Sequence, residues 1–117
     1  MRELKFERTV WAERELAKLC PNKDISLIES LLNTNDFDAK IGFIMKMIII
    51  MNEAYERKAH FLDKSHEMDV VTEEELEYLN EKELLELSNK AFADFYEDAK
   101  TEIETTPKKE KAETKST

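Results

Sequence analysis

The sequence predicts an all-α fold: a compact bundle of about five helices around a buried central helix, with a disordered C-terminal tail. Glycine occurs once and proline twice in 117 residues, whereas turn-rich β folds need many of both. Hydrophobic residues make up 41%, which is enough for one core. Residues 41–51, IGFIMKMIIIM, form an almost unbroken apolar run. We therefore expect a single helical domain over residues 1–104 and a disordered basic tail over 105–117.

The N-terminal region predicts an extended arm followed by a helix. Residues 3–7, ELKFE, alternate polar and apolar side chains, which is typical of a short extended segment. Thr9 is the expected N-cap of a first helix over 10–20, and Pro21 ends it, because proline disfavours a helical residue before it. The apolar stripe of this helix consists of Ala12, Leu16 and Leu19.

The next two helices are predicted from caps and apolar spacing. Asp24 caps a short helix over 25–32, and Asp36 or Asn35 caps a third helix over 37–61. The buried face of the short helix consists of Ile28, Leu31 and Leu32.

The third helix is expected to be the central one. At about 100° per residue, its polar positions up to residue 60 fall on one narrow strip, and nearly everything else as far as Met51 is apolar. A helix that is apolar almost all round is buried by neighbours on several sides. The strip consists of Gly42, Lys46, Glu53, Arg57 and His60.

Two short-range patterns predict the last helices. Residues 60–71 form a connection to which the pattern assigns no structure. Thr72 with Glu75 has the spacing of a capping box and opens a short fourth helix. Asn80 with Glu83 repeats that spacing before a fifth helix at about 81–103. One face of the fifth helix consists of Leu84, Ser88, Ala91, Phe92, Phe95 and Ala99.

Charge and composition exclude several classes of function. A membrane-spanning helix needs about 20 apolar residues, and the apolar run is shorter and contains Lys46. Lys and Arg total 14 and Asp and Glu total 25 in residues 1–104, a net charge of −11 that repels nucleic acid. The single cysteine, Cys20, and an N-terminus without an apolar signal-peptide core predict a cytoplasmic protein.

We find no pattern of an enzyme, a metal site or a cofactor site. His60 and His66 lie six residues apart and would differ by about 240° on a helix, so we expect two solvated histidines near a helix end. Cys20 ends an apolar stripe and is expected to be a buried structural thiol. The glutamates at 73–75 suit the first turn of a helix, where the dipole favours negative charge.

The order of the segments resembles the small tail assembly chaperones of long-tailed phages and prophages. The segments that carry the resemblance are WAERELAKLCP, IIIMNEAYERK, VVTEEELEYL and the basic PKKEKAE. The resemblance covers most of the chain, although no segment is diagnostic by itself. It implies a non-catalytic assembly factor of the host cytoplasm, absent from the mature virion. It also implies binding to the tape-measure protein, recruitment of tail-tube subunits, and a translational frameshift as a further hypothesis.

An apolar partner surface is the feature that such a role requires. A protein that holds apolar helices in solution needs apolar surface to cover them and net charge to keep the complex soluble. We expect partner contacts around Phe43, Met47 and Ile50, and the alternative is that neighbouring helices bury this face. The sequence leaves self-association open. The competing functions are a small acidic inhibitor that mimics DNA and a generic bacterial helical adaptor.

Overall fold

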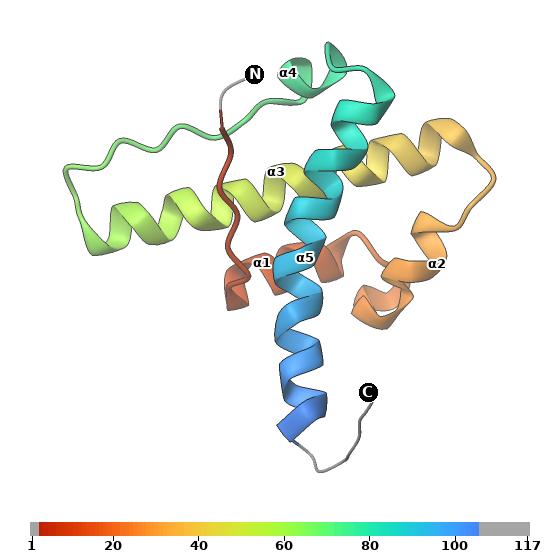
Figure 1. Cartoon of the computed structure of the whole chain (residues 1–117), viewed down its shortest axis with the longest axis horizontal. Coiled ribbons are helices and arrows are strands. Elements are labelled where there is room, and N and C mark those ends of the chain that lie inside the picture. Colours follow the sequence, from red (N-terminus) through yellow and green to blue (C-terminus); the bar gives the residue numbers. More distant parts are fainter. Residues whose placement is uncertain (1–2, 106–117) are drawn as a thin grey trace.

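The 26-residue helix α3 is the element around which the other helices pack (Figure 1). The computed structural model describes residues 3–105, and within the last helix it describes side chains as far as residue 93. Helix α3 contacts each of the other four α-helices, and α5 crosses it at a steep angle (Figure 1). The helices are α1 (Val10–Lys18), α2 (Ile28–Leu32), α3 (Phe37–Leu62), α4 (Glu73–Glu77) and α5 (Glu81–Thr105). The predicted all-α architecture with a central helix is confirmed.

The N-terminal caps of α1, α3, α4 and α5 are those predicted, whereas the predicted cap Asp24 precedes a 3₁₀ turn and α2 follows Leu27. The Thr9 hydroxyl accepts a hydrogen bond from the Ala12 amide at 3.0 Å. Asp36, and not Asn35, caps α3 by accepting from the Ala39 amide at 3.1 Å. These bonds satisfy amide groups that have no partner inside the helix. Reciprocal capping boxes join Thr72 with Glu75 and Asn80 with Glu83.

The region between α1 and α3 differs from the prediction. Helix α1 ends at Lys18 and not at residue 20, and the expected helix over 25–32 is divided into a 3₁₀ turn, Ile25–Leu27, followed by α2. Short 3₁₀ turns are common at the ends of α-helices, and between α1 and the 3₁₀ turn both Asn22 and Lys23 have φ of 57°. Residues other than glycine seldom adopt this left-handed backbone conformation, although asparagine tolerates it better than most.

The core lies along α3 and is completed by the extended N-terminal arm, residues 3–9. Leu4 and Phe6 of the arm are buried while Glu3 and Lys5 are exposed, so the predicted alternation is confirmed. The arm crosses α3 beside α5 (Figure 1). Its backbone is fixed at three places: the Glu7 amide donates to the carbonyl of Met51, the Leu4 carbonyl accepts from the ammonium of Lys90, and the Lys5 carbonyl accepts from Asn52. The buried residues of α3 are Ile44, Met45, Met47, Ile48, Met51, Asn52, Ala54 and Glu56.

Helix α5 presents the predicted face to the core as far as its side chains are described. Leu84, Ser88 and Ala91 are buried, and Phe92 is half-buried. Phe95 and Ala99 lie beyond the described side chains. The domain boundary predicted after residue 104 falls at the end of α5, and residues 106–117 of the predicted disordered tail lie outside the described part of the chain. Within residues 3–105 no helix combines the length and the apolar character that a membrane crossing requires.

Candidate functional site

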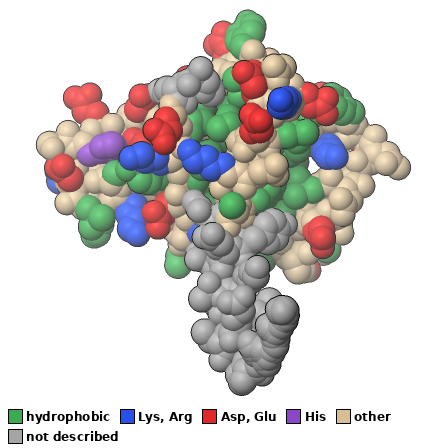
Figure 2. Space-filling model, in the orientation of Figure 1, with side chains coloured by type: hydrophobic (Ala, Val, Ile, Leu, Met, Phe, Trp, Pro, Cys, Tyr) green, Lys and Arg blue, Asp and Glu red, His purple; other side chains and the backbone are tan. Residues whose placement is uncertain are grey.

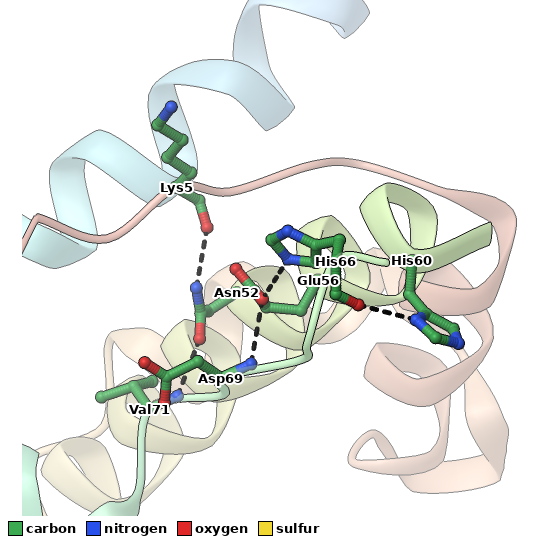
Figure 3. Close-up of polar contacts among 7 residues, drawn as sticks. All are labelled: Lys5, Asn52, Glu56, His60, His66, Asp69 and Val71. Carbon is green, nitrogen blue, oxygen red and sulfur yellow. Dashed lines mark hydrogen bonds and ion pairs between the residues drawn. The ribbon is translucent and has the colours of Figure 1, made fainter. Parts of the chain in front are cut away.

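Two features of α3 are candidates for function, and the first is a polar junction on its second half. Asn52 is only 2% exposed, although it follows the apolar run directly. Its Nδ2 donates to the carbonyl of Lys5 at 3.0 Å, and its Oδ1 accepts from the amide of Val71 at 2.8 Å (Figure 3). The amide of one side chain therefore joins three segments: the arm, α3 and the connection between α3 and α4.

Glu56, one turn after Asn52, extends this junction. Its Oε1 accepts from the amide of Asp69 at 3.0 Å and from Nε2 of His66 at 2.8 Å. The carbonyl of His66 in turn accepts from Nδ1 of His60 at 2.7 Å (Figure 3). We call Asn52, Glu56, His60 and His66 the Asn52 junction. Its buried polar groups are paired with one another or with backbone, as buried groups must be to avoid a desolvation cost.

The two histidines are therefore not free in solvent as expected. Both are half-buried, and both form hydrogen bonds. The expectation was wrong because the sequence pattern gave no path for the connection after residue 60. Helix α3 ends at Leu62, and the connection then runs back along it, which brings His66 beside Glu56 (Figures 1 and 3). Among the described residues no three His, Cys, Asp or Glu side chains are placed to hold a metal ion.

A polar pocket of about 370 Å³ adjoins the junction. Arm residues, α3 and the connection line it, including Lys5, Tyr55 and Glu67. The carbonyl of Lys5 and the amide of Asn52 face each other here, as do Glu56 and His66, so these groups are already used to hold the three segments together. The geometry is that of a structural junction.

No family model, no curated protein and no solved structure matches this chain. The candidate site is therefore defined by the geometry of the chain itself.

The second feature is a pocket of about 610 Å³ where the end of α1, helix α2 and the first half of α3 meet. Its exposed lining is mainly apolar, and the exposed charged side chains of Asp38 and Lys46 also contribute to it. We call it the Phe43 pocket. Its apolar lining consists of Leu19, Leu31, Ala39, Gly42 and Phe43.

The structure separates the three residues that the sequence suggested for partner binding. Phe43 is half-buried and lines the Phe43 pocket. Met47 is 2% exposed and belongs to the core, so it offers a partner no surface in this conformation. Ile50 is half-buried, packs against the core and is not part of the pocket lining. The three side chains therefore do not form one surface, and their part in binding stays a prediction.

Sequence reasoning missed the buried polar pair of the junction, although a signal was present. Glu53 and Arg57 belong to the polar strip, and Asn52 and Glu56 are the residues directly before them. In a helix, neighbouring residues point about 100° apart, so Asn52 and Glu56 point away from the strip. Two polar residues one turn apart and off the solvent-facing strip indicate a buried pair. Their partners on the arm and the connection carry no such signal, because those partners are backbone groups.

Cys20 has the buried position that was predicted. It is 6% exposed, and its Sγ lies 3.6 Å from the carbonyl oxygen of Leu16. Burial, and then the negative charge of Asp24, raise the pKa of the Cys20 thiol. A raised pKa reduces the thiolate fraction and with it the nucleophilic reactivity.

Proposed function

We propose that this protein is a non-catalytic tail assembly chaperone of a long-tailed phage or prophage. In this proposal it binds the tape-measure protein in the host cytoplasm, keeps it soluble, helps to recruit tail-tube subunits, and is absent from the mature virion. The order of segments that resembles this family supports the proposal. The structural observation that carries it is the Phe43 pocket, which is an open and mainly apolar depression on the central helix.

The surface of the chain suits a protein that holds apolar helices in solution. The formal net charge is −9, which keeps a complex soluble by repulsion between its copies. Phe37, the first residue of α3, is 62% exposed and lies next in sequence to Asp38 of the pocket lining. Apolar side chains that a protein leaves in water commonly mark a surface where it contacts a partner.

The distribution of surface charges argues against the alternative function, an acidic inhibitor that mimics DNA. On the face shown in Figure 2, Lys and Arg side chains lie among the Asp and Glu side chains. Several carboxylates are paired with cations, as in Arg8–Glu13 at 2.6 Å and Arg57–Glu53 at 2.9 Å. A DNA mimic needs rows of unpaired carboxylates at the spacing of phosphates, and paired charges weaken such a row.

Affinity purification of the tagged protein from its induced native host, with mass spectrometry, tests the function. Recovery of the tape-measure protein and a tail-tube subunit is the expected result. Recovery of a nuclease or a DNA-binding protein in their place would refute the proposal and favour the acidic inhibitor.

A pair of serine variants tests whether the Phe43 pocket takes part. Phe43→Ser should reduce recovery of the tape-measure protein because it removes the aromatic ring of the pocket. Phe61→Ser is the matched control: Phe61 lies in the same helix, is 73% exposed, and is not in the pocket lining. Circular dichroism checks that both variants fold. Equal recovery with the two folded variants would exclude Phe43 from the binding surface.

A further inference from the structure

The N-terminal arm is held through three contacts with its backbone. Nδ2 of Asn52 donates to the carbonyl of Lys5 at 3.0 Å (Figure 3), and the ammonium of Lys90 donates to the next carbonyl along, that of Leu4, at 3.0 Å. The amide of Glu7 donates a third bond, at 3.1 Å, to a carbonyl of α3. Because these contacts use backbone atoms of the arm, an extended segment of another sequence can form them too. We call the three residues that make them the arm site: Met51, Asn52 and Lys90.

Two apolar side chains of the arm complete the core beside these contacts. Leu4 is 3% exposed and Phe6 is 7% exposed, whereas Lys5 between them is exposed. This is the alternation of an extended chain, in which side chains two residues apart point the same way. If the arm left, core residues would meet water, so a segment that replaces it must bring large apolar side chains at the same spacing.

The arm can leave this position without disturbing a helix. Residues 3–9 form no helix or strand, and the chain joins them to the structured domain only at the start of α1. Segments near a chain end open at a lower free-energy cost than the whole domain. Residues 1–8 contain three basic and two acidic side chains, in a chain whose total charge is −9. An occupant without net negative charge therefore suits the arm site best.

We propose that the arm site binds an extended segment of a partner protein, and that the arm occupies the site until this segment displaces it. The segment has two large apolar residues two positions apart and no net negative charge. Its backbone takes over the three hydrogen bonds, and its apolar side chains replace Leu4 and Phe6. In recognition of extended peptides, main-chain hydrogen bonds supply affinity and alternate side chains supply specificity. The arm is then an intramolecular competitor that lowers the apparent affinity for the partner. The inference does not depend on the proposed function.

Fluorescence anisotropy with labelled peptides and the full-length protein tests the inference. The first peptide has the sequence of residues 1–9, and the second has isoleucine and methionine at the two apolar positions and serine at the others. The full-length double variant Leu4→Ser, Phe6→Ser has an arm that competes weakly, so it should bind the first peptide about tenfold more tightly than the wild-type protein does. It should bind the second peptide within about fivefold of the first, because the backbone contacts are the same. A control peptide with serine at both apolar positions should not bind.

Methylation of the first peptide's amide at the Glu7 position removes the donor to Met51 and should weaken binding about tenfold. Lys58→Glu weakens the arm by another route if the double variant does not fold: Lys58 is exposed and pairs with Glu7 at 3.2 Å, so the substitution makes the two repel. This variant should bind the second peptide about threefold more tightly than the wild-type protein does. If no folded variant binds the peptides, or if methylation has no effect, the inference is overturned. Binding of the first peptide alone, with a dimeric wild-type protein in sedimentation, would identify the occupant as the arm of a second copy and also overturn it.

Discussion

Replacing Asn52 with alanine should destabilise the whole domain, because this side chain joins the arm, α3 and the connection. The substitution removes two hydrogen bonds, to the Lys5 carbonyl and from the Val71 amide. The two are not equivalent. Lys5 is exposed, so water can replace the bond to its carbonyl, whereas Val71 is 2% exposed and its amide would stay buried without an acceptor.

The size of the expected loss in stability follows from the surroundings of these two hydrogen bonds. A buried amide left without a partner costs about 1–3 kcal/mol, and loss of a replaceable hydrogen bond costs about 1 kcal/mol. Alanine regains about 0.5 kcal/mol as the better helix former. We therefore expect the free energy of unfolding to fall by about 1.5–3.5 kcal/mol. With a urea m-value of about 2 kcal/mol/M, the midpoint of unfolding should fall by about 0.8–1.8 M.

Urea unfolding followed by circular dichroism measures this change, with Asn89→Ala as the control. The control makes the same substitution at an exposed position of α5, so it records the helix-propensity gain without the lost bonds. Hydrogen exchange supplies a local measurement, in which the Val71 amide should lose protection. If the two variants differ by less than about 0.5 kcal/mol, the hydrogen bonds of Asn52 do not stabilise the domain and the reasoning is wrong.

Three further predictions concern single groups. Thr72→Ala removes the hydroxyl of the α4 capping box and should lower the free energy of unfolding by about 1 kcal/mol in a thermal melt; an unchanged melt would exclude the cap as a source of stability. The Cys20 thiol, whose pKa burial raises, should react with Ellman's reagent slowly in the native protein and quickly in urea, and equal rates would contradict its buried position. Hydrogen bonds from Ser65 lower the pKa of the Asp63 carboxyl, so its contribution to stability is present above the ordinary carboxyl pKa and is lost as the pH falls through the lowered value. Ser65→Ala removes the hydroxyl bond and should raise that pKa in a carbon-detected NMR titration, and an unchanged pKa would show that the Ser65 hydroxyl does not hold the carboxylate.

The elements predicted correctly from the sequence are those determined by residues that lie close to one another in the chain. Thr9, Asp36 and Thr72 cap amide groups within three residues of themselves, so their pattern is complete in a short window. The apolar run of α3 likewise predicts several neighbouring helices, and α1, α2, α4 and α5 all contact α3. The division of the helix expected at 25–32 was missed because apolar spacing does not distinguish a 3₁₀ turn from the first turn of an α-helix.

The path of the connection after α3 could not be predicted in the same way. Glu56 holds it by contacts with Asp69 and His66, 13 and 10 residues away in sequence. Nothing in a short window shows that a chain turns back on the helix that it has just left. The Phe43 pocket could not be predicted from the sequence either, because its lining comes from α2, α3 and the residue after α1, whose mutual positions depend on the whole core. Phe43 was named from its apolar character alone.

The N-terminal arm also has a consequence for the order in which the chain folds on the ribosome. The Leu4 carbonyl accepts its hydrogen bond from Lys90, 86 residues later in the sequence. At about 5–20 residues per second, Leu4 is synthesised roughly 4–17 s before Lys90. Throughout that interval Leu4 and Phe6 lack the part of the core that α5 supplies. The arm is thus among the earliest described segments to be synthesised, and it reaches its final packing only after the first turns of α5 have emerged.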